Sequence, residues 1–536
     1  MSIRLGIDVG GTFTDFLLFD EEKETFHLHK TLSTPEDQSV GILDGMRSIL
    51  DQTNLSADDI RSMLHGTTVA TNIVLEAKGA RVGLLVTENF EQVLHLARSQ
   101  TPGPLAGWIT MDKPEPLADL ELTRGVPERI NAQGEILQPL DESRAREMAD
   151  ELVRKGADSI TISLLHAYAN PVHEQRLRDV VTSAYPDLPI SLSSEILPEF
   201  REYERTSTTV VNAYVAPIMS QYLGRISEEA GATHVRIMGS NGGVLPVERA
   251  KREPVHTVLS GPAGGVIGAL TWARRSGREL IISFDMGGTS TDVSLCPGRP
   301  LRTREFEIAG QPTSIPVLDI HTVGAGGGSF ARVDAGGALR VGPQSAGADP
   351  GPICYGRGGS KVTVTDAHVW LGRLPTSAFL GGAEALDQHA IREPLGTTAA
   401  ALSASLEQTA EGILAVADTA MERALRVISV ERGYDPADFT IVAFGGAGGL
   451  HVAELTERVG AHEALIPPDP GLLSAYGMLA SPVTRETART VLQATNDAGT
   501  ESYIEEALEA LALQAWTEML EEGANPDDLS TELWID

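Results

Sequence analysis

Apolar residues recur with two different periods along this chain. Short apolar runs are typical of strands, whereas apolar residues spaced three or four apart predict amphipathic helices. The helical pattern covers 36–51, 141–155, 171–184, 201–229, 404–433 and 501–522. Strands are predicted at 3–7, 16–19, 81–87, 158–165, 189–193, 235–239, 280–284, 293–296, 439–444 and 531–536. This mixture favours the α/β class, with parallel or mixed sheets.

One eight-residue pattern, Asp-x-Gly-Gly-Thr-x-Thr-Asp, occurs twice between predicted strands. It covers 8–15 and 285–292. Paired glycines allow a tight turn that brings backbone N–H groups close to a ligand, and threonine hydroxyls can donate to oxyanions. An aspartate at a strand end can hold Mg²⁺, usually through its waters. The repeat therefore favours two phosphate-binding turns over two ordinary hairpins.

A third glycine-rich turn, 445–449, follows the strand 439–444 and leads into a helix. It lacks the Gly-Lys-Ser/Thr of a Walker A loop, but its small residues let a nucleotide approach closely. Two phosphate turns from similar halves and a late glycine turn resemble the actin, sugar kinase and Hsp70 superfamily. That resemblance implies an α/β fold of two ribonuclease H-like lobes with an ATP cleft between them, plus inserted α/β segments.

Composition narrows the class of protein. The chain has 536 residues, a net charge of −32 and two cysteines. Such a charge opposes a broad basic surface, so we expect neither nucleic acid nor a membrane as partner. Two cysteines exclude a disulfide framework, and Met1 leads directly into the first strand without a signal peptide. These features predict a cytoplasmic protein with more than one domain.

Other polar clusters leave alternatives open. His65 belongs to a His-Gly-Thr-Thr segment that can bind substrate or cap a helix. Two Asp-x-His pairs, Asp319 with His321 and Asp366 with His368, can form a divalent-metal or acid/base site, or can lie in surface loops. We expect the charge cluster 201–206, which opens a long helix, to be a solvated face.

These residues together resemble the hydantoinase A / 5-oxoprolinase / acetone carboxylase β-subunit family. The resemblance spans nearly the whole chain, and its most family-specific part is 319–359. The matching stretches are 7–15, 65–76, 198–199, 201–217, 240–244, 260–265, 284–292, 319–329, 342–359, 362–374 and 444–451.

The family implies ATP-dependent activation of a carbonyl, with Mg²⁺, or Mn²⁺ as an alternative. It implies that Asp8 and Asp285 bind the metal, and that the two Asp-x-His pairs belong to a functional site and not to surface loops. The expected catalytic residues are Asp8, Asp285, His65, Asp319 and His321, and Asp366 and His368 join the metal ligands. The expected nucleotide contacts are Gly10, Gly11, Thr12, Thr14, Gly287, Gly288, Thr289, Thr291, Gly445, Gly446, Ala447 and Gly448.

The resemblance also implies an assembly. Family members of this type work with a separate hydantoinase B-type subunit in a hetero-oligomer, and act on a small-molecule carbonyl compound. Three regions are expected: an N-terminal lobe at 1–200, a central ATPase lobe at 201–485, and a short C-terminal region at 486–536. Relative to family chains of more than about 600 residues, the last region looks short or truncated.

Three activities remain open at this point. The first is phosphorylation and hydrolytic opening of a cyclic amide such as hydantoin, 5-oxoproline or a lactam. The second is carboxylation of a ketone such as acetone or acetophenone. The third belongs to another class, a nucleotide-switched binding protein.

Overall fold

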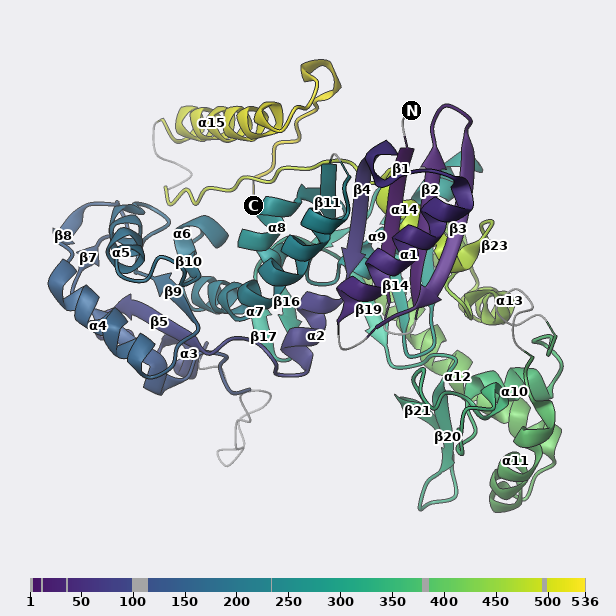
Figure 1. Ribbon diagram of the computed structural model, residues 1–536. Coiled ribbons are helices and arrows are strands. Elements are labelled where there is room, and N and C mark those ends of the chain that lie inside the picture. The colour runs from purple at the N-terminus through teal and green to yellow at the C-terminus, as the bar shows by residue number, and fades with distance from the viewer. Residues whose placement is uncertain are drawn as a thin grey trace.

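Two mixed β-sheets with the same strand order form the frame of the molecule (Figure 1). The computed structural model describes residues 3–10, 13–34, 37–98, 114–232, 234–377, 385–493 and 499–535. The first sheet has the order β12-β11-β4-β1-β2-β3. Its strands are β1 (Ile3–Val9), β2 (Phe13–Asp20), β3 (Thr25–Leu32), β4 (Ile60–Thr67), β11 (His234–Met238) and β12 (Val244–Pro246).

The second sheet repeats the core of the first. Its order is β19-β14-β13-β22-β23. In the first sheet, β1 pairs antiparallel with β2 and parallel with β4, and β2 pairs antiparallel with β3. In the second sheet, β13 pairs antiparallel with β14 and parallel with β22, and β14 pairs antiparallel with β19. The prediction of two lobes of one α/β type is confirmed. The strands are β13 (Leu280–Met286), β14 (Thr291–Pro297), β19 (Ile320–Val323), β22 (Thr440–Phe444) and β23 (Glu463–Leu465).

Two helices fill the space between the sheets. Side chains of α9 (Ser260–Arg275) and α14 (Leu473–Ala480) share one buried cluster with residues of both sheets. Glycines let these helices approach each other closely, since a Cβ on Gly477 would lie 1.8 Å from the carbonyl oxygen of Gly264. This contact fixes the lobes at the point where both glycine-rich hairpins end.

A smaller parallel sheet lies beside the first lobe, at the left of Figure 1. It is covered by α4 (Glu142–Arg154) and α5 (Val172–Thr182). The long helix α7 (Glu202–Glu229) runs from this unit to the first sheet, contacting β9 near its start and α1 (Gln38–Thr53) further on. The strands are β5 (Val82–Thr87), β6 (Thr123–Val126), β9 (Ser159–Ser163) and β10 (Ile190–Leu192).

The second lobe carries its own helical layer, at the lower right of Figure 1. There α12 (Leu406–Ile428) packs against α10 (Val364–Trp370), α11 (Gln388–Leu402) and α13 (Gly448–Val459). The shorter elements are α2 (Val69–Leu75), α3 (Val93–Leu96), α6 (Ser193–Ile196), α8 (Val247–Arg252), β7 (Arg129–Ile130), β8 (Ile136–Gln138), β15 (Arg302–Thr303), β16 (Phe306–Ile308), β17 (Gln311–Thr313), β18 (Val317–Leu318), β20 (Ser329–Val333) and β21 (Leu339–Ser345).

The predicted helices agree with the structure to within a few residues, apart from the last turn of 404–433, because their ends carry recognisable caps. Asp37, Asp141 and Ser405 each accept a backbone N–H at the start of their helix. The predicted final strand is wrong, since the described part of 531–536 forms no strand and follows the polar end of α15 (Thr500–Glu521). The region boundaries at 200 and 485 stay predictions, although the first sheet takes β11 and β12 from beyond residue 200.

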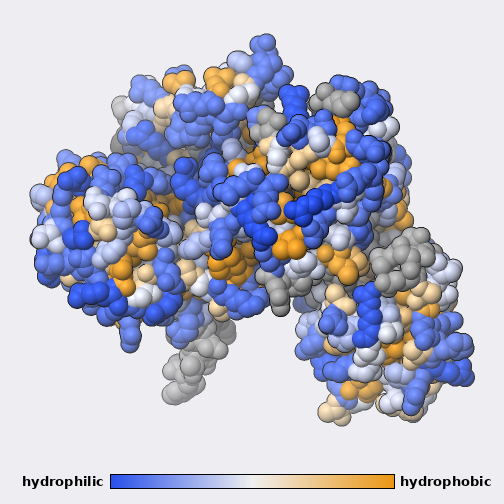
Figure 2. Space-filling view, in the orientation of Figure 1, coloured by the Kyte–Doolittle hydropathy of each residue, from blue (hydrophilic) through white to orange (hydrophobic). Residues whose placement is uncertain are grey.

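Polar and charged side chains cover most of the face shown in Figure 2, and apolar side chains gather there in small groups. Along the parts of the chain that are described, none of the helices combines the length and the apolar character needed to cross a bilayer.

Candidate functional site

The two repeated motifs fold into matching β-hairpins. In the first, the Gly10 N–H donates to the Phe13 carbonyl oxygen at 3.0 Å; in the second, the Gly287 N–H donates to that of Ser290 at 3.1 Å. The hairpins join β1 to β2 and β13 to β14. Gly11 and Thr12, also expected to contact phosphate, lie outside the described residues. The local structure is therefore the strand, turn and strand that the pattern predicts.

Each hairpin places two carboxylates opposite each other. Asp8 pairs with Asp15, and Asp285 pairs with Asp292. Burial raises the pKa of Asp8 to about 7, and the charge of Asp15 adds to this shift. Burial also raises the pKa of Asp285 well above its usual range, with further contributions from Asp292, Asp8 and Asp15. Because charges interact strongly only at short range, Asp285 lies near Asp292 of its own hairpin and near Asp8 and Asp15 of the other lobe.

The sequence reasoning missed three residues that support the first hairpin. Lys30 on β3 lies opposite Asp15, and its Nζ is 2.6 Å from the Asp15 Oδ1. The charge of Lys30 lowers the pKa values of both Asp15 and Asp8, in opposition to burial. Ser474 of α14 hydrogen-bonds to Asp8. Counting the hairpin register back from the turn would have placed Lys30 opposite Asp15.

Ser33 is the third of these residues. Its hydroxyl donates to the Gly10 carbonyl oxygen at 2.7 Å and lies 3.1 Å from the Thr14 Oγ1. Thr14 is buried. The Thr14 hydroxyl therefore helps to hold the turn. Thr291 does the same in the second hairpin, because its hydroxyl donates to the Ala325 carbonyl oxygen at 2.6 Å. The expected contact between Thr291 and phosphate stays a prediction.

The tip of the second hairpin is open. Gly288 and Thr289 are exposed. A Cβ placed on Gly288 would meet no atom of the described residues within 4 Å. The other side of this turn is covered by glycine backbone: the Gly327 N–H donates to the Gly287 carbonyl oxygen at 3.1 Å, and the Gly328 N–H to that of Gly288 at 2.7 Å. The glycine-rich 324–328 segment thus supports the turn and leaves its tip accessible.

The third glycine turn meets the second hairpin. The Ala447 N–H donates to the Met286 carbonyl oxygen at 2.9 Å. Gly445 has a positive φ of 78°, and a Cβ there would lie 2.3 Å from the Asp285 Oδ1. A side chain cannot fit at this position, so the close approach requires glycine. The second and third turns, predicted separately from the sequence, are therefore adjacent.

Helix α9 begins beside the first hairpin. Ser260 closes a two-way contact with Thr67, accepting from its N–H at 3.1 Å and donating to its carbonyl oxygen at 2.8 Å. A Cβ on Gly261 would lie 3.7 Å from the Asp8 Oδ1. The positive end of this 16-residue helix is thus close to the carboxylates.

His65 does not belong to this site. It pairs with Ile7, one residue before Asp8, so its side chain points to the opposite face of the sheet. It is fully buried, and its Nε2 lies 2.7 Å from the hydroxyl of Tyr222. Burial lowers the pKa of His65 to about 4. The prediction of a catalytic His65 is therefore wrong, and the residue is a hydrogen-bonded part of the core.

The first Asp-x-His pair is also separated from the carboxylates. Asp319 forms an ion pair with Arg432. His321 lies opposite Val293, one residue beyond Asp292, and so faces away from the four aspartates. The expected catalytic roles of Asp319 and His321 find no support in this arrangement, because sequence spacing does not tell which face of a strand a residue occupies.

The second Asp-x-His pair does not form a metal site. The Asp366 carboxylate accepts from the backbone N–H groups of Cys354 and Thr363, both at 2.9 Å, and from the Thr363 hydroxyl. It caps α10 and ties a loop to it. His368 instead points to His451, with 3.0 Å between their Nε2 atoms. In the described parts of the chain, no three His, Cys, Asp or Glu side chains are grouped to hold a metal ion.

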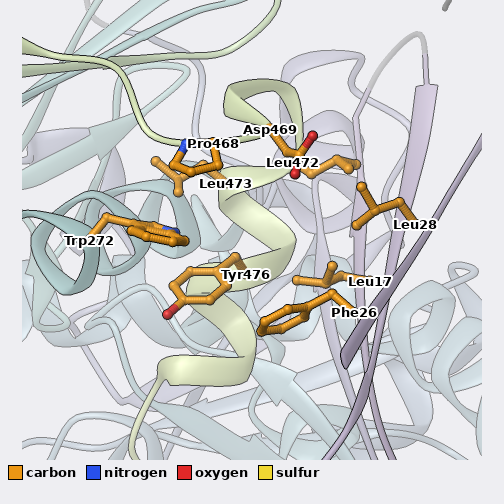
Figure 3. Close-up of a pocket in the computed structure, with 9 residues that line it drawn as sticks. All are labelled: Leu17, Phe26, Leu28, Trp272, Pro468, Asp469, Leu472, Leu473 and Tyr476. Carbon is orange, nitrogen blue, oxygen red and sulfur yellow. The ribbon is translucent and has the colours of Figure 1, made fainter. Parts of the chain in front are cut away.

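A small aromatic pocket lies two residue pairs along the strands from Asp15 and Lys30, at Leu17 and Leu28 (Figure 3). Its volume is about 70 Å³. Figure 3 shows rings from β3, α9 and α14 around a largely apolar space. It is too small and too apolar for the triphosphate of a nucleotide. Its lining residues are Leu17, Phe26, Leu28, Trp272, Pro468, Asp469, Leu472, Leu473 and Tyr476.

Comparison with known proteins identifies relatives that match nearly the whole of this chain. The caprolactamase subunit alpha of Pseudomonas jessenii is 37% identical over 98% of this chain and 77% of its own length. The 5-oxoprolinase 1 of Arabidopsis thaliana is 32% identical over 99% of this chain and 45% of its own length. These relatives are enzymes or enzyme subunits.

Solved structures give the same result. The crystal structure of the ATP-dependent caprolactamase from Pseudomonas jessenii matches with a TM-score of 0.87 and 36% identity, over 98% of this chain and 77% of that one. The nucleotide-free acetone carboxylase structure matches with a TM-score of 0.80 and 31% identity over the same shares.

Two family profiles cover most of the sequence. The profile of the hydantoinase/oxoprolinase N-terminal region matches residues 4–185, and the hydantoinase/oxoprolinase profile matches residues 205–487. The resemblance found in the sequence is thereby confirmed: this chain belongs to the hydantoinase/oxoprolinase family of enzymes.

Proposed function

We propose that this chain is the ATP-using subunit of an enzyme that phosphorylates the carbonyl oxygen of a cyclic amide, so that water can open the ring. The observation that carries the proposal is the convergence of two like hairpins, each with a paired carboxylate, at the junction of two lobes. A site of this kind suits γ-phosphoryl transfer, which depends mainly on positioning and charge neutralisation.

The exposed tip at Gly288 and Thr289 would present backbone N–H groups to the phosphates. Lys30 would supply a positive charge from the first lobe, where it already pairs with Asp15. Gly445 to Gly448 would line the adenosine pocket, since these residues lie against Asp285 and Met286. Together these groups would hold the triphosphate between the lobes.

Mg²⁺ fits the residues present. Asp8 and Asp285 are half-buried oxygen donors, and the pKa of each is raised by burial and by neighbouring carboxylates, an effect that a bound cation would offset. Mg²⁺ retains several waters, so it needs only one or two carboxylates and no cluster of three. When bound, the ion would neutralise charge on the transferring phosphoryl group.

In the proposed reaction, the carbonyl oxygen of the substrate attacks the γ-phosphorus, and the bond from that phosphorus to the bridging oxygen of ADP breaks. Lys30 and the turn N–H groups would stabilise the charge that develops on the phosphoryl oxygens. A first water attacks the activated carbon, and the ring nitrogen leaves as an amine after protonation, which gives an acyl phosphate. A second water attacks the same carbon, and phosphate leaves with the former carbonyl oxygen, so that both oxygens of the carboxylate come from water. A separate B-type subunit would complete this second half.

A ketone carboxylase subunit is the second candidate, favoured by the structural match to acetone carboxylase. Phosphate release from ATP by the chain with a B-type subunit distinguishes the two. We expect stimulation by caprolactam, 5-oxoproline or hydantoin without bicarbonate. Stimulation that requires acetone or acetophenone together with bicarbonate would instead establish the carboxylase. If neither group of compounds stimulated turnover, both candidates would be excluded.

A further inference from the structure

A second cavity lies far from the phosphate hairpins, where the small parallel sheet meets the start of α7. Its volume is about 240 Å³. The loop after β9 provides His166 and Tyr168, and α7 with the residue before it provides Arg201, Glu202 and Arg205. Tyr222, which contacts His65 of the first sheet, lies on α7, 21 residues after Arg201. About 30 Å of helix therefore separates the cavity from this contact with the first sheet.

This cavity corrects the expectation that the 201–206 charge cluster is a solvated face. Arg205 is only 1% exposed. Its guanidinium donates to three neutral oxygens: the Ser193 hydroxyl at 3.1 Å, the Glu199 carbonyl at 3.0 Å and the Leu164 carbonyl at 2.8 Å. Among the described residues it contacts no carboxylate directly. Burying a cation is costly unless a negative charge lies close by, and the carboxylates of Glu174 and Glu202 act on Arg205, Glu174 through the Ser193 hydroxyl that both contact. The guanidinium also lines the cavity.

A second cation lies at the same cavity. Arg201 is exposed, and within the described residues it takes part in no ion pair, although its guanidinium lies over the Phe200 ring at 5.3 Å. Arg201 and His166 both have a positive φ, 74° and 56°, in the left-handed region that side chains disfavour. These two strained residues therefore present polar side chains to one space, as strained residues at ligand sites often do.

The other lining groups limit what can bind. The Tyr168 hydroxyl lies 3.3 Å from the His166 Nδ1, and the Arg205 guanidinium lies over the Tyr168 ring. Ala132, Leu165, Phe200 and Leu492 supply apolar wall. Glu202 adds one negative charge, so the net charge of the lining suits a single negative charge and disfavours a dianion such as phosphate.

From the cavity, its two guanidinium groups and its apolar wall, we infer that this site binds a small monocarboxylate with a short aliphatic chain. The carboxylate lies toward Arg201, with the charge of Arg205 behind it, and the aliphatic chain lies against Phe200 and Leu165. The inference goes beyond the proposed function and does not depend on it, because the site requires neither ATP nor a carbonyl substrate.

Isothermal titration calorimetry of the full chain with butyrate tests this inference, with butyramide as the neutral match and inorganic phosphate as the dianion. We expect butyrate to bind with a Kd of about 1 mM, the range open to so small a ligand. Butyramide and phosphate should bind at least about tenfold more weakly. If butyrate fails to bind, or butyramide or phosphate binds as well as butyrate does, the inference is wrong.

Two variants with opposite expected effects separate binding from a structural change. Arg201→Gln should weaken butyrate binding about tenfold or more, whereas Glu202→Gln should strengthen it about threefold. Arg176→Gln is the matched control, because Arg176 lies on α5 of the same unit and pairs with Glu142 instead. Unchanged melting temperatures confirm folding. Equal affinities for wild type and Arg201→Gln would overturn the assignment.

Discussion

The two phosphate hairpins have the same backbone but different surroundings. In the first, Asp15 has a cation, Lys30, at 2.6 Å, and Ser33, directly after β3, holds the turn. In the second, the hydroxyl of Thr322 is the hydrogen-bond partner of Asp292. Glycine backbone from 326–328 covers one side of that turn. The pKa of Asp285 is raised by burial and by Asp292, Asp8 and Asp15, whereas the raised pKa of Asp8 is opposed by the charge of Lys30.

This difference indicates two roles for one repeated motif. The first hairpin carries its own positive charge, so it can meet phosphate oxygens directly. The second is acidic, so it needs an added cation before an anionic phosphate can approach. We expect changes at the second hairpin to act through the metal, and changes at Lys30 to act on the phosphoryl group.

The largest effect should come from Asp285→Asn. The variant removes a half-buried carboxylate for which no ion pair is found among the described residues, so we expect ATP-dependent turnover to fall about 10³-fold. The melting temperature of the nucleotide-free chain should stay the same or rise, because asparagine has the same shape without the buried charge. Phosphate release and thermal unfolding measure the two effects. A drop in melting temperature would show that Asp285 is structural.

Lys30→Met should reduce turnover about 10²-fold by removing the charge that the first lobe supplies. Lys23→Met is a suitable control, because Lys23 also pairs with an aspartate, Asp20, through a 2.7 Å contact on the same pair of strands, but in the turn away from the hairpin tip. The control should retain full activity. If both variants lost turnover equally, Lys30 would have no specific role at the phosphate site.

Gly288→Ala tests the open hairpin tip. The new Cβ has free space in the nucleotide-free chain, so the melting temperature should not change, whereas the KM for ATP should rise about tenfold as phosphate contacts are lost. Gly326→Ala is the opposite case, since its Cβ would lie 2.7 Å from the Gly288 carbonyl oxygen and should destabilise the fold. If Gly288→Ala leaves KM unchanged, phosphate does not approach that tip.

The smallest effect is the pH dependence due to Asp8. Its pKa rises from 3.8 to about 7 in the folded chain, so the folded state favours the protonated form. This stabilising contribution is present at low pH and is lost as pH rises from about 4 to about 7. Thermal unfolding of wild type and Asp8→Asn should therefore diverge across that range, with the variant relatively more stable at the higher pH. Parallel curves would contradict the raised pKa.

The features that could be predicted from the sequence are those encoded by the repeated motif and by local residue patterns. Both hairpins, the third glycine turn and most helices were predicted because turn glycines and caps act over a few residues. Lys30 was missed because the register of the hairpin of β2 with β3 was not counted back from its turn, and Ser33 was missed because it lies in the loop directly after β3, where no strand pattern places it. His65 was misassigned because a shift of one residue reverses the face that a strand residue occupies. The Asp366 carboxylate was misassigned because a capping role and a metal role use the same residue type.

The most direct test of the proposed function follows one oxygen atom. The chain is assembled with a B-type subunit and supplied with ATP and caprolactam labelled with ¹⁸O at its carbonyl, and the released phosphate is analysed by mass spectrometry. Phosphorylation of the carbonyl oxygen predicts that phosphate carries the label, because that oxygen leaves with phosphorus when water attacks the carbon. Turnover that releases unlabelled phosphate, with the label retained in the ring-opened acid, would contradict the proposal.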